Sequence, residues 1–440
     1  MSDTTRVLTQ DIHQHVGETI RIEGWLHKKR LLGGLNFITI RDRKGLAQSL
    51  IENKDELEKL RGMQTGTVLA FTGKVVEDER APGGAELHDV TVEVLVPVTT
   101  EPPIEIDKPL DHKPENLDTL FEHRVIGLRN IQETAIFKIQ AAVKEAVRVY
   151  LRSQDFTEFN SPKLLPGATE GGAEVFSLDY FGKEATLAQS AQFYKQMMVG
   201  VFERAFEINP TYRAEPSATT RHMTEFIQVD VEMGFTDFNG LLNVVGGLLQ
   251  SVTESVWKTN EADLKKWNAK PVVLPAEIPR IPLEKIHELY TEANGEDTRG
   301  EKDLRPDEER WITEYAKKNL GSEAVFVVDW PASEMKFYHR KSESNPDLVD
   351  RADLIFRGVE IATISMRENR YEVLLEQLRT IAGGDPTAEG FKYYLQAFQF
   401  GLPPHGGFGM GLERLVQKII GLNNVKEATL FPRDINRLAP

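Results

Sequence analysis

The chain has 440 residues, 40% of them hydrophobic and 28% charged, which suits two or three globular domains with hydrophobic cores. Its net charge of −15 argues against nucleic-acid binding through overall charge, although a local basic patch can still bind phosphates. There are no cysteines, which excludes disulfides, thiol catalysis and cysteine-held zinc. The sequence has no run of about 18 apolar residues and begins with a polar stretch, so we expect a cytoplasmic protein without a membrane partner.

Residues 17–100 have the pattern of a small β domain. Turn residues occur at Gly33-Gly34, Lys44-Gly45 and Pro82-Gly83-Gly84. Between them lie five short segments that are rich in β-branched residues and partly alternate, namely IRIEGWLH, LNFITIRD, AQSLIE, TVLAFTGKV and HDVTVEVLVPV. Five short strands predict a closed β-barrel of the OB-fold type, which we assign to residues 1–103.

Two short basic runs lie in this predicted barrel, at residues 27–30 and 41–44. Such runs are compatible with a local phosphate-binding patch. On charge alone, solvated turns of a small β domain are the simpler explanation.

A proline-rich connector, TTEPPIEIDKPLDHKPEN, follows the barrel. Its prolines predict a semi-rigid hinge, which we assign to residues 104–130. A second domain then spans residues 131–440. It opens with a helix at residues 131–152, where one apolar stripe runs through Ile136, Ile139, Val143, Ala146 and Tyr150.

The rest of the second domain mixes strands and helices without regular alternation. FTEFNSP, AFEINPTYRAE and EFIQVDVEMGF are strand-like, whereas NGLLNVVGGLLQSVTESVW and GMGLERLVQKII are helix-like. This pattern predicts the α+β fold class. Residues 258–345 are more polar and rich in charge, and we interpret them as an insertion within this domain.

Several common motifs are absent. No GxxxxGK[ST] phosphate loop occurs, and the glycines at 407, 409 and 411 do not have GxGxxG spacing. His13 and His15 form an HxH pair, which near a terminus is far more often a surface feature than a metal site.

The most informative segment is TYRAEPSATTRHMTEFIQVDVEM, at residues 211–233. Two predicted strands flank a polar loop there. Asp230 and Glu232 are two residues apart, so on a strand they point to one face. Buried carboxylates need partners, because an unpaired buried charge is costly. By itself this pattern also fits a salt-bridged sheet that faces solvent.

The same segment resembles motif 2 of the class II aminoacyl-tRNA synthetases, with its Arg-x-Glu, loop, Arg-His and Glu-Phe pattern. GFGMGLERL at residues 407–415 resembles motif 3, and Pro162 after FTEFNSP resembles motif 1. The order and spacing of all three match over nearly the whole chain. An OB domain before the catalytic domain resembles the aspartate, asparagine and lysine branch. The archaeal-type aspartyl enzymes are the most similar, because asparaginyl enzymes usually have another sequence at Asp230.

This resemblance implies a catalytic domain with an antiparallel sheet flanked by helices, and a homodimer that uses motif 1. It implies activation of L-aspartate with ATP and transfer of aspartate to the 3′-terminal adenosine of tRNA, without an enzyme nucleophile. Arg213 and Arg414 would be the catalytic residues. The full ATP site would consist of Arg213, Glu215, Arg221, His222, Phe226, Glu360, Gly411 and Arg414.

The resemblance also implies a site for each of the other ligands. Asp353 and Glu360 would bind Mg²⁺ through hard carboxylate oxygens. Lys195 and Arg367 would bind the aspartate side chain. Glu170, Gln192 and Asp230 would surround its ammonium group, and Gly171-Gly172 would let the loop close over it.

On the OB domain, Phe37 and Gln48 resemble residues that stack on and hydrogen-bond the anticodon. His27 and Pro82 resemble the relaxed, non-discriminating type, which charges both tRNA(Asp) and tRNA(Asn). An amidotransferase would then convert the mischarged product. A strictly discriminating enzyme is the alternative.

One short run departs from the resemblance. The family usually has glycines where this chain has Ile364 and Ser365, and their side chains could crowd the active site. The departure keeps open a non-catalytic tRNA-binding paralogue. A third alternative activates aspartate or asparagine for a purpose other than tRNA charging, although such relatives generally lack the OB module.

Overall fold

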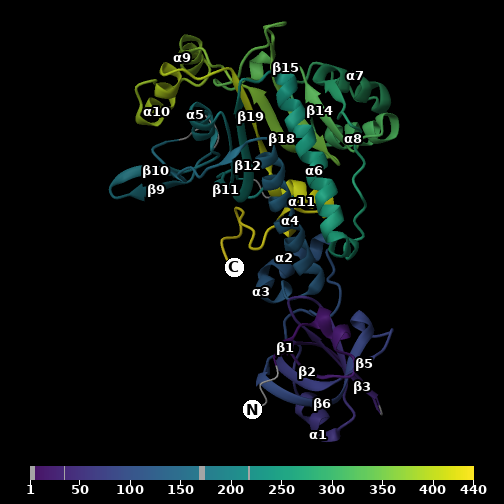
Figure 1. Ribbon diagram of the computed structural model, residues 1–440. Helices are drawn as coiled ribbons and strands as arrows, with labels where there is room; N and C mark the ends of the chain where they lie inside the picture. Colours follow the sequence, from purple (N-terminus) through teal and green to yellow (C-terminus); the bar gives the residue numbers. More distant parts are fainter. Residues whose placement is uncertain (1–4, 34, 168–173, 217–218) are drawn as a thin grey trace. The chain divides into compact units, whose positions relative to one another are not determined.

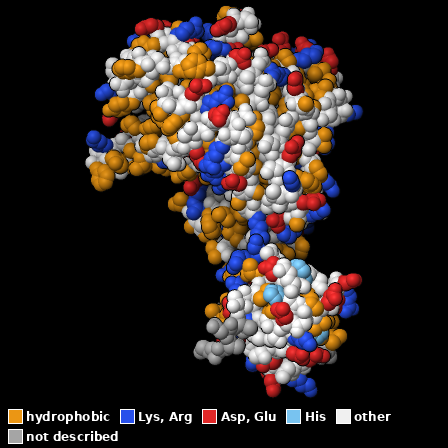
Figure 2. Space-filling view, viewed as in Figure 1, with side chains coloured by type: hydrophobic (Ala, Val, Ile, Leu, Met, Phe, Trp, Pro, Cys, Tyr) orange, Lys and Arg blue, Asp and Glu red, His pale blue; other side chains and the backbone are white. Residues whose placement is uncertain are grey.

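The computed structural model describes residues 5–33, 35–167, 174–216 and 219–440 (Figure 1). The chain divides into two compact units, Met1–Thr134 and Ala135–Pro440. None of the helices in these described ranges is both long and apolar enough to cross a bilayer. On the visible face of each unit, acidic and basic side chains are interspersed (Figure 2).

The first unit contains the predicted barrel. Its sheet order is β1-β2-β3-β4-β6-β5, and an additional pairing of β2 with β5 closes five strands into a barrel. Apolar side chains that alternate along these strands form its core. Helix α1 (Lys54–Arg61) lies between β4 and β5. The strands are β1 (Arg6–Val7), β2 (Thr19–Leu32), β3 (Leu35–Arg41), β4 (Leu46–Leu50), β5 (Val68–Glu77) and β6 (Ala85–Val96).

The region that we expected to be a hinge carries two helices, α2 (Pro114–Glu122) and α3 (Arg124–Gly127). Pro114 begins α2, where a missing N–H costs nothing. The buried carboxylate of Glu133 accepts hydrogen bonds from Arg124 at 3.0 Å and pairs with His112 at 2.7 Å. The proline-rich segment is therefore part of the first unit, which continues beyond the barrel to Thr134.

The second unit is built on one eight-stranded sheet, in the order β13-β14-β17-β18-β19-β12-β11-β7. Strands from β14 to β11 pair antiparallel, and the two edge pairs are parallel. This arrangement confirms the α+β class. The strands are β7 (Thr157–Glu158), β11 (Arg204–Tyr212), β12 (Glu225–Gly234), β13 (Arg280–Pro282), β14 (Ala324–Val328), β17 (Arg351–Phe356), β18 (Val359–Met366) and β19 (His405–Gly411).

Three helices cover one face of this sheet, namely α4 (Ile131–Ser153), α6 (Phe238–Lys265) and α11 (Leu412–Ile420) (Figure 1). They bury the apolar half of each alternating strand, such as Val229 and Val231 of β12 and Phe408 of β19. Because side chains alternate across a strand, the polar half faces the opposite side. That opposite face carries the site described below.

The predicted insertion at 258–345 differs from our expectation, because it is partly integral to the sheet. Helix α6 continues to Lys265, and β13 and β14 pair into the main sheet next to β17. The strand AVFVV of β14 is fully buried. It is short and lies within a charge-rich stretch of sequence, so the composition of that stretch did not indicate a core strand. Helices α7 (Leu283–Asn294) and α8 (Pro306–Leu320) of this segment pack against β14 and β17 through a further apolar cluster.

The other elements surround the polar face. They are β8 (Leu164–Leu165), β9 (Ser177–Tyr180), β10 (Lys183–Leu187), α5 (Gln192–Phe202), β15 (Trp330–Pro331), β16 (Leu348–Val349), α9 (Tyr371–Thr380) and α10 (Glu389–Gln399).

Candidate functional site

The site exists because glycines on β19 face polar side chains on β12. In the strand register, Glu232 lies opposite Gly407 and Asp230 opposite Gly409. A Cβ atom on Gly407 would lie 2.0 Å from Oε2 of Glu232, and one on Gly409 would lie 2.2 Å from Nε2 of Gln228. The glycine run thus gives the carboxylates and the amide of β12 room beside the sheet.

A cavity of about 450 Å³ opens over this face. Most of the site residues predicted from the sequence line it, which are Gln192, Lys195, Arg213, Glu215, Arg221, His222, Phe226, Glu360, Arg367, Gly411 and Arg414. Asp230 and Asp353 lie below its surface, and Glu170 is outside the described residues. The structure adds lining residues that the sequence did not indicate, among them Gln228, Lys336, Tyr338, His339, Arg351 and Thr363.

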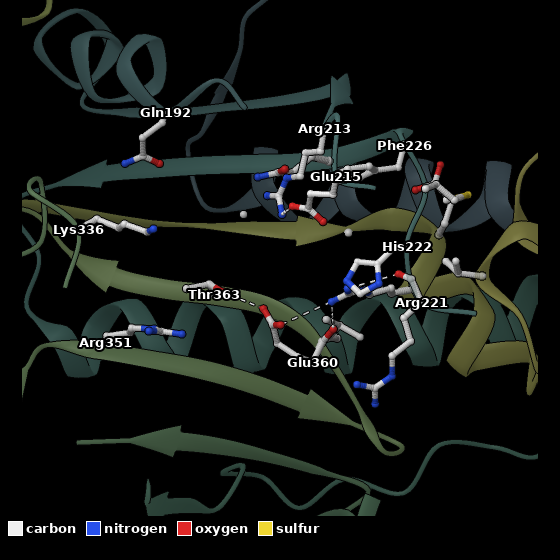
Figure 3. A pocket seen from close by; sticks show the side chains of 18 of the residues that line it. Gln192, Arg213, Glu215, Arg221, His222, Phe226, Lys336, Arg351, Glu360 and Thr363 are labelled. Atoms are coloured by element: carbon white, nitrogen blue, oxygen red, sulfur yellow. Dashed lines mark hydrogen bonds and ion pairs between the residues drawn. The ribbon is translucent and has the colours of Figure 1, made fainter. Parts of the chain in front are cut away.

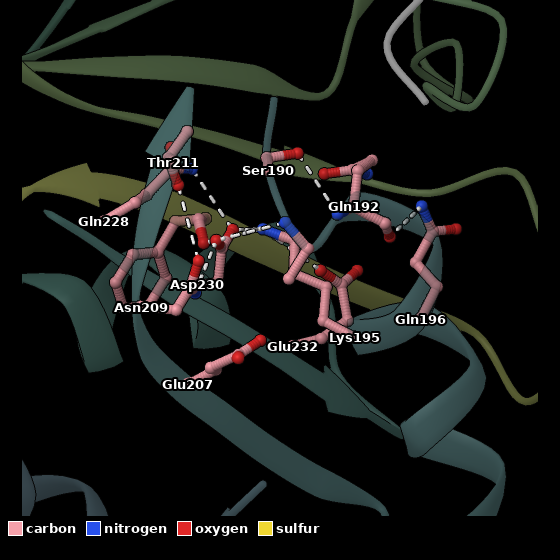
Figure 4. Close-up of polar contacts among 12 residues, drawn as sticks. Ser190, Gln192, Lys195, Gln196, Glu207, Asn209, Thr211, Gln228, Asp230 and Glu232 are labelled. Carbon is pink, nitrogen blue, oxygen red and sulfur yellow. Dashed lines mark hydrogen bonds and ion pairs between the residues drawn. The ribbon is translucent and has the colours of Figure 1, made fainter. Parts of the chain in front are cut away.

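One end of the cavity holds a buried lysine. Lys195 of α5 donates hydrogen bonds to Asp230 and to the carbonyl oxygen of Phe408, both at 2.9 Å (Figure 4). Asp230 also accepts from Asn209 at 3.3 Å and from Gln228 at 3.2 Å. Both oxygens of this carboxylate therefore accept hydrogen bonds from within the protein, and one of these bonds holds the ammonium group of Lys195 in place.

Arg367 is the second buried cation at this end. Its Nε donates to Glu232 at 2.8 Å and its Nη2 at 3.2 Å, while Nη1 donates to the hydroxyl of Ser365. Burial lowers and the Glu232 carboxylate raises the pKa of this guanidinium, with a net rise. Gln192 lines the same end, and its buried Nε2 has no hydrogen-bond partner within the described chain. Such an orphaned donor fits a polar ligand.

At the other end of the cavity, two arginine side chains form longer ion pairs with carboxylates than Lys195 and Arg367 do. The guanidinium of Arg213 lies 5.4 Å from the ring of Phe226 and 4.0 Å from the carboxylate of Glu215 (Figure 3). Arg414 donates to the carbonyl oxygen of Glu360 at 2.8 Å and lies 3.5 Å from its carboxylate. An aromatic face with several cations suits a planar base with phosphates.

His222 belongs to this end of the cavity. Burial lowers its pKa, and the neighbouring Arg414 lowers it further. His222 shares a hydrogen bond of 2.6 Å with the hydroxyl of Thr219. Its ring therefore offers a hydrogen-bonding group at this end of the cavity.

Arg221 turns away from Arg213 in Figure 3 and is held by a carboxylate of α8. Its terminal nitrogens donate to Glu309 at 3.1 and 2.9 Å, and one of them also donates to the carbonyl oxygen of Gly358 at 3.0 Å. Burial raises the pKa of Glu309 despite the attraction of Arg221. Glu309 also accepts the backbone N–H of Glu360 at 3.0 Å, which ties α8 to the cavity wall.

The two carboxylates predicted to bind a metal ion have different surroundings. Glu360 lines the cavity and accepts from the hydroxyl of Thr363 at 2.8 Å. Burial opposes its ionisation, but Arg414 and that hydroxyl outweigh burial and lower its pKa. Asp353 instead pairs with Arg351 at 2.7 Å, and burial raises its pKa to about 7. Glu360 is thus the available anionic ligand, with Asp353 behind it.

The expected crowding at Ile364 is wrong, because Ile364 points away from the cavity. It is fully buried in the core against the helices, on the face shared by Ala362 and Met366. Ser365 is on the cavity face, where its hydroxyl contacts Arg367 instead of filling ligand space. Alternation along β18 explains both positions.

The comparisons with known proteins match both units. Residues 116–435 match the family described as tRNA synthetases class II (D, K and N). The chain belongs to this family. Residues 20–97 match the OB-fold nucleic acid binding domain.

Individual relatives of this class II synthetase match it over nearly its whole length. Aspartate--tRNA(Asp/Asn) ligase of Thermus thermophilus is 41% identical over 437 residues, covering 99% of this chain and 100% of the relative. Aspartate--tRNA(Asp) ligase of Pyrococcus horikoshii is 37% identical over 430 residues, covering 96% and 97%. The crystal structure of asparaginyl-tRNA synthetase from Pyrococcus horikoshii with asparaginyl-adenylate is 30% identical, with a TM-score of 0.91 and full coverage of both chains.

In the OB unit of this synthetase, two of the predicted anticodon residues share the outer face of the barrel. Phe37 lies opposite Leu50 and Gln48 opposite Thr39, so the two are diagonal neighbours on β3 and β4. Both are half-buried, and Gln48 donates to Glu86 at 2.8 Å. Half-exposed side chains on one face can meet a ligand base.

The other two anticodon residues have different positions. His27 lies at an irregularity between Leu26 and Lys28 and is only 6% exposed. Burial and then the nearby Arg41 lower its pKa. Pro82 is exposed in the turn between β5 and β6. His27 therefore acts from beneath the surface if it affects anticodon choice.

The synthetase site contains residues that its sequence did not reveal. Lys336, Tyr338 and His339 come from the polar segment that we interpreted as an insertion, which offered no strand or motif signal. Glu232 was visible as the partner of Asp230 at strand spacing, and that signal could have placed it in the site. Glu309 gave no signal, because it meets Arg221 from 88 residues away.

Proposed function

We propose that this protein activates L-aspartate with ATP and transfers it to the 3′-terminal adenosine of tRNA(Asp) and tRNA(Asn). The observation that carries the aspartate assignment is the buried cation pair Lys195 and Arg367 at one end of the cavity. A side-chain carboxylate would be paired there, whereas a neutral amide would leave buried N–H groups without an acceptor. Relatives named as aspartate ligases support the same substrate.

The first step joins the α-carboxylate of aspartate to the α-phosphate of ATP and expels pyrophosphate. Both reactants are anionic, so the site must neutralise charge and hold them in line. Arg213 would stabilise the charge that builds on the α-phosphate, and Phe226 below it would stack on adenine. Arg414 would bind the distal phosphates through its planar fork.

The ammonium group of aspartate needs acceptors at the buried end. Gln192 lines the cavity there and would offer its side-chain oxygen as an acceptor. Asp230 lies beneath the surface, where it accepts a hydrogen bond from Lys195, and would add negative charge near the ammonium. In the second step the 3′-hydroxyl of tRNA attacks the aspartyl-adenylate and releases AMP. No side chain of the cavity has to become covalently attached.

Mg²⁺ fits the phosphate end because Glu360 presents a carboxylate beside the hydroxyl of Thr363. Bound there with the triphosphate, the ion would shield phosphate charge. Asp353 is paired with Arg351 at 2.7 Å, so we assign it the support of Glu360 and Arg351 behind the ion.

The proposed tRNA range includes both aspartate and asparagine tRNAs. The relative of 41% identity is named for both tRNAs, whereas the Pyrococcus ligase is named for tRNA(Asp) alone. Aspartylation of two purified tRNAs, one with each anticodon, tests this range. Comparable rates support it, and charging of tRNA(Asp) alone supports the strictly discriminating alternative.

The proposal also concerns the partners of the enzyme. A relaxed enzyme requires an amidotransferase that converts aspartyl-tRNA(Asn), and tRNA charging for translation fits the expected cytoplasmic location. We expect a homodimer through the motif 1 region, where α4 has an exposed apolar residue, Val149. Sedimentation measures this assembly directly.

Aspartate-dependent ATP–pyrophosphate exchange separates this enzyme from a non-catalytic paralogue. Arg213, Arg414 and Glu360 line one cavity together, and a lapsed enzyme has no need of this arrangement. Exchange that depends on aspartate supports the proposal. Absence of exchange with a folded chain contradicts it.

A further inference from the structure

Ser365 lies on β18, and its hydroxyl contacts Arg367, which lines the buried end of the cavity. Strand alternation places Thr363, Ser365 and then Arg367 on the same side. Ser365 is 1% exposed, and its hydroxyl accepts a hydrogen bond from Nη1 of Arg367. Glycine is the residue that the family pattern has at this position, so this contact is a feature of the present chain.

The contacts of Arg367 account for three of its donors. A guanidinium has five N–H groups in a rigid plane. Nε and Nη2 each donate to Glu232, and Nη1 donates to Ser365. Two N–H groups therefore remain, one on each terminal nitrogen, and among the described residues no hydrogen-bond acceptor meets them.

The plane of Arg367 is fixed from a third direction. The ring of Tyr338 lies 5.4 Å from the guanidinium carbon. Glu232 holds one edge of the plane and Ser365 holds Nη1, so rotation of the group would break at least one contact to a buried partner. The two remaining N–H groups thus have a fixed direction, which matches the two oxygens of a carboxylate.

We propose that Ser365 is a positioning residue that aims Arg367 at the side-chain carboxylate of the substrate and thereby sharpens discrimination against the amide. This role rests on the proposed activation of aspartate. A carboxylate accepts both free N–H groups, whereas an amide offers one acceptor oxygen and a donor that opposes the second N–H. A guanidinium without its contact to Ser365 can turn to use the amide oxygen alone, so it distinguishes the two ligands less well.

The test is ATP–pyrophosphate exchange with Ser365→Ala at saturating ATP, with aspartate and asparagine as separate substrates. We expect the KM for aspartate to rise about tenfold, equivalent to about 1.4 kcal/mol, while kcat changes less than about twofold. The efficiency with asparagine should stay unchanged, so discrimination falls by the same factor. Ser365→Thr keeps the hydroxyl and should restore most of the loss.

Ser322→Ala is the matched control, because Ser322 is another fully buried serine with a hydrogen bond, 2.6 Å to the carbonyl oxygen of Ala324. It should leave the KM for aspartate unchanged. Unchanged KM in Ser365→Ala, or an equal loss with Ser322→Ala or with Ser365→Thr, would overturn the positioning role. Absence of aspartate-dependent exchange in the unmodified protein would instead contradict the proposed function itself, and with it this role.

Discussion

The two ends of the cavity hold their cations in different ways. At the buried end, Lys195 and Arg367 are 1% and 4% exposed, and each is paired with a carboxylate that has no contact with solvent. At the other end, Arg213 is 35% exposed and its nearest carboxylate is 4.0 Å away. The first end is fixed before a ligand arrives, and the second is free to adapt.

This difference follows from what each end has to bind. A small ligand that must be told from a similar one needs groups held in one geometry by surrounding contacts. A triphosphate is flexible and highly charged, so cations that can move to meet it are sufficient. The comparison predicts that substitutions at the buried end change stability and selectivity together, whereas those at the other end change chemistry alone.

Arg213→Ala should have the largest effect on activity. Its guanidinium would face the charge that develops on the α-phosphate, and loss of such a donor costs about 10³-fold in kcat, or about 4 kcal/mol. Stability should change little, because Arg213 is partly exposed and weakly paired. Exchange kinetics and thermal unfolding measure the two effects. Arg299→Ala removes an exposed arginine elsewhere and should leave both unchanged.

Asp230→Asn should have the opposite profile, with a large loss of stability. It removes the carboxylate that accepts a hydrogen bond from Lys195 at 2.9 Å and leaves only the Glu232 carboxylate, 3.9 Å from this buried ammonium. Removal of one partner from such a buried ion pair costs about 4 kcal/mol. Glu215→Gln at the other end should change stability by less than about 0.5 kcal/mol. Chemical denaturation of the two variants compares the ends directly, and equal losses would break the contrast between them.

The pH dependence of stability should reveal a buried carboxyl between β12 and α11. Burial raises the pKa of Glu413 to about 7, from 4.5 in an exposed group, although the N–H of Ile227 donates to it. Between these values the folded state binds more protons than the unfolded state, so stability falls as pH rises from 4.5 to 7. The shift corresponds to about 3 kcal/mol.

Glu413→Gln keeps the acceptor for Ile227 and removes the titration. Denaturant unfolding at pH 5 and pH 7 should show a smaller decline in this variant than in the unmodified protein. The pKa of Asp353 is also raised, to about 7, so this residue makes stability fall with pH in both the variant and the unmodified protein. The difference in slope between these two proteins therefore reports the titration of Glu413. Identical slopes would show that Glu413 is ionised in the folded state.

Much of this site could be predicted from the sequence, because its residues lie in short motifs. Arg213 and Glu215, in the segment that follows β11, and Gly411 and Arg414 near the C-terminus line one cavity. The expected strand stops at Tyr212, before these two residues. The barrel and the α+β class followed from strand patterns. The direction of Ile364 could not be foreseen from its neighbours alone, because the register of β18 had not been determined.

Contacts between distant segments were beyond the sequence for a different reason. Lys336 and Tyr338 come from a segment whose polarity suggested an insertion within the catalytic domain. Its bridge between His339 and Arg367 brings this segment to the cavity. Tertiary packing decides which polar residues are buried, and no local pattern encodes that choice. Glu309 is the clearest case, since it reaches Arg221 only through the position of α8.

The smallest expected effect concerns this last pair. Glu309 occupies both terminal nitrogens of Arg221, so phosphates that use Arg221 must compete with it. Glu309→Gln should therefore lower the KM for ATP by about threefold, equivalent to about 0.7 kcal/mol, because a neutral amide competes less strongly than a carboxylate for the guanidinium. Glu314→Gln, on an exposed position of the same helix, should have no effect. A higher KM for ATP in Glu309→Gln would mean that Glu309 orients Arg221 for the phosphates, which would make this end of the cavity as preorganised as the other.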